Sequence, residues 1–147
     1  MLKNISLIII IAILISACEE SATKKRGGKF GMSDGNVPEF AAIEFFEHIY
    51  HSKGLEGAIQ LSTPKMERLI RSYRTNKSVQ KHILNMRFDT VTIKTNSRSA
   101  GRNEFSQNAQ VSIFFAGKLH GNILKDLRVV ELIKVDNNWK VDAVSLN

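Results

Sequence analysis

The chain is poor in the residues that cross-link small folds, and it lacks any apolar run long enough to span a bilayer. Its 147 residues include one cysteine, two prolines and one tryptophan. One cysteine cannot form a disulfide within the chain or a structural zinc site, which needs about four ligands. A composition of 43% hydrophobic and 24% charged residues excludes a polytopic membrane protein and a disordered polyelectrolyte. The length suits one globular domain with appended segments.

The longest apolar run lies near the N-terminus. It extends from Ile5 to Ile15, follows the positive charge of Lys3, and is interrupted only by Ser6. A bilayer-spanning helix needs about 20 apolar residues, whereas the core of a signal peptide needs about 7 to 15. We therefore predict a signal peptide over residues 1–17.

The end of this run, Leu14-Ile15-Ser16-Ala17-Cys18, resembles a bacterial lipobox. The resemblance implies cleavage between Ala17 and Cys18 and attachment of acyl chains, palmitate among them, at Cys18. Each buried methylene contributes about 0.8 kcal/mol, so three chains would form an effectively permanent anchor. An ordinary signal peptide cut after Ala17 and an uncleaved anchor are the alternatives. Because Glu19 follows the cysteine where lipoproteins of the inner membrane carry Asp, the resemblance favours the periplasmic face of the outer membrane over the inner membrane.

Residues 18–36 are rich in Ser, Lys, Arg, Glu and Gly, and we expect a lipidated flexible tether. The basic residues of this segment either contact anionic headgroups or keep a spacer solvated. Residues 37–147 would then form the folded domain.

Helical periodicity dominates the first half of this domain. Pro38 suits the first turn of a helix, and apolar residues recur after it with spacings of three and four until Gly54. A short helix over about Leu55–Leu61 is expected next. Apolar spacing then predicts helical segments at Met66–Tyr73 and Val79–Leu84.

The period changes to two beyond Asn85. Alternating residues predict strands at Phe88–Ile93, Ala109–Phe115, Leu127–Val135 and from Trp139 to Ala143, and the last two are joined by a tight turn. Polar connections are expected at 96–103 and 117–121. Phe114, out of phase with the apolar set, suggests that both faces of the sheet are partly covered. Short turns between consecutive strands predict an antiparallel meander, and the fold class is α+β, with N-terminal helices packed on a curved four-stranded sheet.

The segments PEFAAIEFFEHIYHSKGLEGAIQLSTPKM and VVELIKVDNNWKVDAVSLN together resemble small bacterial lipoproteins with a nuclear-transport-factor-2-like, or cystatin-like, domain. The resemblance implies a cone between sheet and first helix. Some members of this superfamily are enzymes with an Asp and a His inside the cone, and many others are noncatalytic binding domains.

Asp89 and His48 are the candidates for such a catalytic pair, and a pocket would be lined by Phe46, Asp89, Phe115 and Trp139. The alternative for the pocket residues is ordinary core packing. Glu47 and His51 are spaced for a pair on a helix surface. No nucleophile motif, phosphate loop or third clustered metal ligand is present, so the sequence predicts no enzyme activity, no metal and no cofactor.

Positive charge is concentrated in one stretch. Residues 65–102 contain ten Lys and Arg but only two acidic residues, Glu67 and Asp89. Arg68, Arg71, Arg74, Lys77 and Lys81 are expected to form a basic helical surface. The predicted compartment argues against nucleic acid. The expected function is that of a lipid-anchored, noncatalytic accessory domain in the periplasm. It would contact an anionic envelope component or a protein partner through the basic surface or the open end of its sheet, and a dimer is left open.

Overall fold

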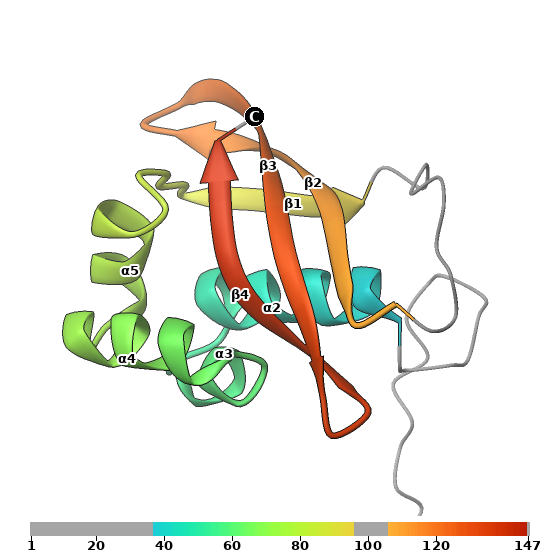
Figure 1. Ribbon diagram of the computed structural model, residues 1–147. Coiled ribbons are helices and arrows are strands. Elements are labelled where there is room, and N and C mark those ends of the chain that lie inside the picture. Colours follow the sequence, from blue (N-terminus) through green and yellow to red (C-terminus); the bar gives the residue numbers. More distant parts are fainter. Residues whose placement is uncertain (1–36, 96–105, 147) are drawn as a thin grey trace, which may run out of the picture. The chain divides into compact units, whose positions relative to one another are not determined.

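The computed structural model describes residues 37–95 and 106–146 (Figure 1). The described helices are α2 (Pro38–His51), α3 (Glu56–Gln60), α4 (Pro64–Tyr73) and α5 (Asn76–His82). The strands are β1 (Thr90–Thr95), β2 (Asn108–Leu119), β3 (Asn122–Val135) and β4 (Asn138–Leu146). The predicted signal peptide, lipobox and tether lie outside the described residues, and so does the predicted connection at 96–103.

The strands form one antiparallel sheet in the order β1-β2-β3-β4. This confirms the predicted α+β class and the four-stranded meander. In Figure 1, α2 crosses behind the strands, whereas α4 and α5 lie beyond β4 at the left of the view. Within residues 37–95 and 106–146, no helix has the length and apolar character needed to cross a membrane.

Helix α2 supplies much of the core. Ala42, Phe45, Phe46 and Ile49 are buried, and their spacings of three and four place them on one side of the helix. Phe46 contacts Phe115 of β2 edge to face, with ring centroids 4.9 Å apart. Aromatic packing of this kind holds the helix against the middle of the sheet.

The two faces of the sheet differ in composition and burial. The inner face contributes to the core with residues such as Val111, Phe115, Val130 and Leu132. Phe114, which points to the other face, is 37% exposed. The helices therefore pack on one face, whereas on the other face Phe114 is partly exposed and its neighbours Leu127 and Val129 are half-buried.

Both hairpin turns use two residues with positive φ. His120 and Gly121 connect β2 to β3, and Asp136 and Asn137 connect β3 to β4. Turns of this kind follow the right-handed twist of the flanking strands. The second hairpin confirms the predicted tight turn.

The β2–β3 hairpin is longer than predicted. We expected a turn from Gly117 to Gly121 and a strand starting at Leu127, but β2 continues to Leu119 and β3 starts at Asn122. Gly117 is paired with Val91 in the sheet. A Cβ at Gly117 would lie 2.1 Å from the carbonyl oxygen of Thr90, so the glycine permits close strand packing rather than a turn.

The free edge of β4 is partly covered by the connection between α3 and α4. The backbone N–H of Thr63 donates to the carbonyl of Val141 over 2.9 Å, and the N–H of Val141 donates to Leu61 over 2.7 Å. These bonds fix the start of α4 beside the sheet and reduce the number of unpaired groups on an edge strand.

Candidate functional site

The clearest candidate for a contact surface is the basic surface, made of Arg68, Arg71, Arg74, Lys77 and Lys81, which are all exposed. It spans α4, its C-cap residue and α5. The opposite side of these helices is buried through residues such as Met66, Ile70 and Val79. Burial of the apolar stripe therefore turns the basic residues toward solvent.

Hydrogen bonds to one carboxylate connect the start of α4 to β4. Asp142 accepts hydrogen bonds from the Thr63 hydroxyl at 2.8 Å and from Lys65 Nζ at 2.9 Å. The hydrogen bond from Lys65, followed by that from Thr63, holds the pKa of Asp142 below its usual value. This carboxylate therefore stays ionised and keeps the N-terminal end of the basic surface in place.

Side-chain hydrogen bonds connect helix α5 to the end of α2. The amide nitrogen of Asn76 donates to the carbonyl oxygens of His48 and Ile49, each at 3.0 Å. The amide of Gln80, which is buried, also donates to Ile49 over 3.0 Å. These side chains satisfy carbonyl groups that a helix end leaves without partners in the helix. The basic surface therefore rests on a defined scaffold.

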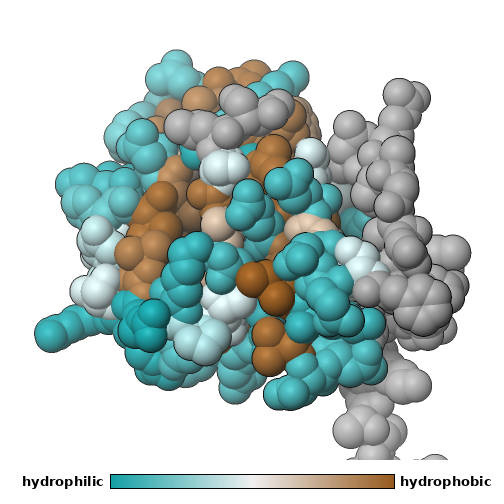
Figure 2. Space-filling model, viewed as in Figure 1, coloured by the Kyte–Doolittle hydropathy of each residue, from teal (hydrophilic) through white to brown (hydrophobic). Residues whose placement is uncertain are grey.

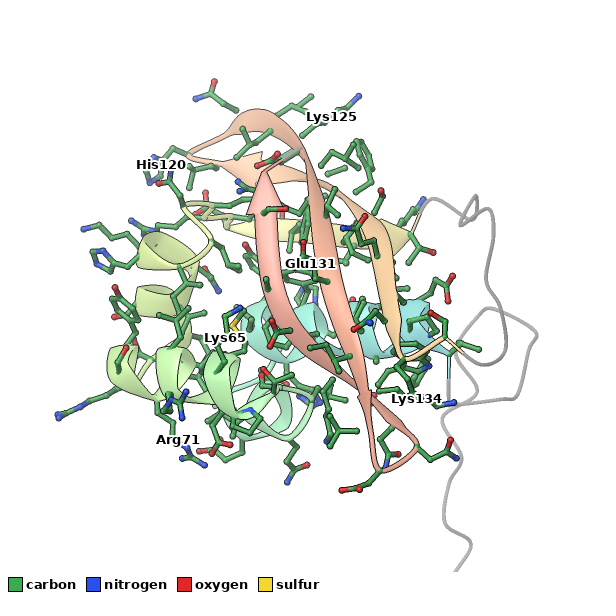
Figure 3. The ribbon with its side chains drawn as sticks, viewed as in Figure 1. Lys65, Arg71, His120, Lys125, Glu131 and Lys134 are labelled. Atoms are coloured by element: carbon green, nitrogen blue, oxygen red, sulfur yellow. The ribbon has the colours of Figure 1, made fainter. Side chains whose placement is uncertain are left out.

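Charge on this surface is largely uncompensated. Residues 64–87 carry seven Lys and Arg and one acidic residue, Glu67, which pairs with Arg71 at 2.7 Å. In Figure 3, Arg71 lies on the side of α4 away from the sheet. No carboxylate of the described residues forms an ion pair with the other four residues of the basic surface. The arrangement suits contact with a polyanion, since several guanidinium and ammonium donors face outward together.

A second cluster lies on the inner face of β3 and was missed in the sequence. Arg128 is 5% exposed, and its Nη2 donates to Asp126 Oδ2 at 2.7 Å. Its Nε has no hydrogen-bond partner. The alternation along β3 was the available signal, because Arg128 shares its phase with the buried Val130 and Leu132.

Tyr50 of α2 belongs to the same region. Its hydroxyl donates to the carbonyl of Met86 at 2.8 Å, and its ring contacts Phe88 and Phe115. Burial raises the pKa of Tyr50, and the positive charge of Arg128 works in the opposite direction. A phenol that stays protonated and already has an acceptor is a structural group here rather than a general base.

The predicted pocket residues occupy different places. Phe46 and Phe115 pack against each other and are fully buried. Trp139 is buried at another part of the sheet, where Lys134 Nζ lies 5.8 Å from its ring centroid. Asp89 is exposed just before β1 and accepts a hydrogen bond from the backbone of His120. The structure joins the two phenylalanines but does not bring Asp89 to them.

His48 and Asp89 also have separate surroundings. The Nδ1 of His48 lies 3.1 Å from the hydroxyl of Ser52, and its ring packs against Gly57 of α3. Asp89 contacts the β2–β3 turn instead. The predicted pair of Glu47 and His51 forms on the exposed side of α2, at 2.6 Å. Across residues 37–95 and 106–146, no three His, Cys, Asp or Glu side chains are grouped to hold a metal.

The comparisons with known proteins identify no family for this chain. No protein-family model matches the chain, and no curated protein matches it.

Proposed function

We propose that the protein is a bacterial lipoprotein whose domain, residues 37–147, serves as a noncatalytic accessory module of the cell envelope. In this proposal Cys18 carries the acyl chains, residues 18–36 act as the tether, and the anchor lies in the outer membrane on its periplasmic face. These three elements lie outside the described residues and rest on the sequence. The finer fold that we propose is the cystatin-like, or nuclear-transport-factor-2-like, cone.

The observation that carries the binding function is the basic surface. Four of its five residues have no carboxylate partner among the described residues, and all five are exposed. We infer that it binds an anionic envelope component that presents phosphate or carboxylate groups. Arg68, Arg71 and Arg74 favour such ligands because a guanidinium can donate two parallel hydrogen bonds to one anionic group.

An anchor and a basic surface act together in this proposal. The acyl chains hold the domain near the membrane, so a weak second contact becomes intramolecular and gains from a high effective concentration. Each Lys or Arg near an anionic surface contributes about 1 kcal/mol. A surface with a few unpaired basic residues is therefore sufficient without a pocket.

The alternative function, a small-ligand or enzymatic domain that uses Asp89 and His48, has less support. A catalytic pair needs both side chains within reach of one reacting group. Asp89 contacts the turn at His120, whereas His48 contacts Ser52 and Gly57. No observation among the described residues brings the two together.

The test is binding of the Cys18→Ser chain to three probes: phosphatidylglycerol vesicles, lipopolysaccharide and peptidoglycan sacculi. We expect each probe bound by the unchanged chain to bind less to a variant in which Arg68, Arg74, Lys77 and Lys81 are changed to Glu. The matched control changes Lys53, Lys94, Lys118 and Lys125, which are exposed elsewhere, to Glu. Binding should also fall steeply with added salt, because surface electrostatics are screened.

Two results would overturn the binding proposal. One is that none of the three probes binds at low salt. The other is that the control variant loses as much affinity as the variant of the basic surface, since binding would then depend on total charge rather than on α4 and α5.

A further inference from the structure

Two aromatic rings stack between α4 and α5. Tyr73 is the last residue of α4 and His82 the last residue of α5, and their ring centroids lie 5.5 Å apart with the ring planes inclined by 11°. Tyr73 is half-buried and packs against the core cluster, whereas His82 is exposed. The core therefore fixes the ring of Tyr73, and stacking on that ring orients the flat imidazole of His82 at the surface of the domain.

The stacked rings carry polar groups at their edges. Among the residues that the structure describes, neither the Tyr73 hydroxyl nor a ring nitrogen of His82 has a hydrogen-bond partner, so these groups can bond a ligand. Leu69 precedes Tyr73 by four residues, which makes the two side chains neighbours on the surface of α4, and it is 42% exposed. We call Leu69, Tyr73 and His82 the platform, since together they combine apolar surface with polar edges.

Basic residues of both helices flank the platform. Arg74 directly follows Tyr73, and Lys81 directly precedes His82. In Figure 2, hydrophilic and apolar residues lie side by side at the left of the viewed face, where Figure 1 shows α4 and α5. One pair of helices thus offers positive charge for anionic groups and, beside it, a platform for an uncharged part of the same ligand.

We propose that the ligand of the basic surface is an anionic saccharide of the cell envelope, and that the platform contacts its sugar rings. A pyranose ring presents apolar C–H groups on its face and hydroxyl groups at its edge, so it matches a flat apolar surface with polar edges. Phosphate or carboxylate groups of the same polymer pair with Arg74 and Lys81. This inference rests on the proposed binding function of the basic surface and narrows the class of its ligand.

The platform favours a saccharide over a lipid headgroup. Attraction of a basic surface to anionic headgroups is a charge effect to which each Lys or Arg contributes, and it needs no ring in a fixed orientation. Rings that are already stacked in the free protein lose little conformational freedom on binding, which favours a ligand whose own rings are rigid. Phosphorylated sugars of lipopolysaccharide and the carboxylate-bearing polymer of peptidoglycan are the two sources of this chemistry.

The experiment measures binding of the Cys18→Ser full chain to lipopolysaccharide, to peptidoglycan sacculi and to phosphatidylglycerol vesicles. The unchanged chain should bind one of the two saccharide probes, and that probe identifies the source. His82→Ala removes the exposed ring and should weaken this binding by about fivefold or more, while binding to vesicles stays within about twofold. His82→Phe keeps a flat ring and should stay within about threefold of the unchanged chain on the saccharide probe.

The matched control is His51→Ala, which removes an exposed histidine from α2 and should leave binding to all three probes unchanged. The proposal is overturned if neither saccharide probe binds, if His82→Ala binds the saccharide probe as tightly as the unchanged chain, or if it weakens vesicle binding by the same factor. Equal losses in His82→Ala and His82→Phe would also overturn the role of ring stacking.

The binding function of the basic surface and the saccharide inference can fail separately. If the four changes to Glu in the basic surface abolish binding but His82→Ala does not alter it, the binding function stands and the saccharide inference is wrong. If only the vesicles bind, the same conclusion follows.

Discussion

Thr63, the N-cap residue of α4, donates its hydroxyl proton to Asp142 of β4 over 2.8 Å. The same hydroxyl oxygen accepts a hydrogen bond from the backbone of Met66 at 3.4 Å. One side chain therefore caps the helix and links it to the last strand. Residues 79 positions apart in the chain are joined in this way, and the basic surface depends on the link.

The charge of Asp142 should make stability depend on pH in the acidic range. Its pKa is lowered in the folded protein, chiefly by the hydrogen bond from Lys65. The carboxylate therefore stabilises the fold above the unfolded pKa of about 3.9, and this contribution disappears as the pH falls through the lower, folded pKa. Asp142→Asn should lower the free energy of unfolding by about 1–2 kcal/mol at neutral pH. Urea denaturation from neutral pH down to strong acid should show this difference shrinking, whereas a constant difference would contradict the assignment.

Loss of the amide donor of Asn76 should lower the free energy of unfolding. Asn76→Ala removes the hydrogen bonds to the carbonyls of His48 and Ile49, and we expect a loss of about 1–2 kcal/mol. Asn76→Asp should cost more than the alanine variant at neutral pH, because a carboxylate would face carbonyl oxygens. Chemical denaturation of both variants measures the order. An Asn76→Ala variant as stable as the unchanged chain would show that the amide donor is unimportant.

Removing one member of the buried pair of Asp126 and Arg128 should destabilise the fold strongly. Replacing both members with apolar residues should destabilise it much less. Asp126→Ala leaves a buried guanidinium without its carboxylate, and we expect destabilisation of about 3 kcal/mol. The double variant Asp126→Leu with Arg128→Met should recover most of that loss, because well-packed apolar groups need no partner. A double-mutant cycle by thermal or urea unfolding provides the test. If the double variant is less stable than Asp126→Ala alone, the pair has another role.

Two glycines should respond differently to alanine. A Cβ at Gly117 would lie 2.1 Å from a backbone oxygen of Thr90, so the strands must move apart, and a loss of about 2–3 kcal/mol is expected. At Gly121 nothing lies within 4 Å, and the cost arises from its φ of 82°, at about 1–2 kcal/mol. Amide exchange should show β1 opening more readily in the Gly117→Ala variant alone. The reverse order of stability would contradict the strand packing described above.

The proposed anchor has a direct test. Cys18→Ser removes the thiol that would accept the acyl chains, so the protein should move from the membrane fraction to the soluble periplasmic fraction. Fractionation and intact-mass measurement of both chains would show this change. Retention of a full-length Cys18→Ser chain in the membrane would instead indicate an uncleaved apolar segment.

The local pattern was sufficient to predict most elements, and long-range pairing accounts for the main error. Spacings of three and four identified α2, and alternation identified the strands, because a buried face repeats with the geometry of its element. Because glycine is common in turns, the local pattern predicts that Gly117 starts a turn. Its place in β2 depends on the nearby carbonyl of Thr90, 27 positions earlier in the chain, which no local pattern contains.

Of the candidate sites, too, the sequence predicted one part, and only the structure decided the rest. The basic residues of α4 and α5 were evident in the sequence because charge and helical spacing are local properties. Three features were not evident in the sequence: the hydrogen bond from Thr63 to Asp142, the separation of Asp89 from His48, and the buried position of Arg128. Composition and periodicity alone determined the α+β class and the basic stretch. Only the tertiary structure decided which groups meet, because contacts between distant residues are set by the packing of the sheet on α2 and by the register of its strands.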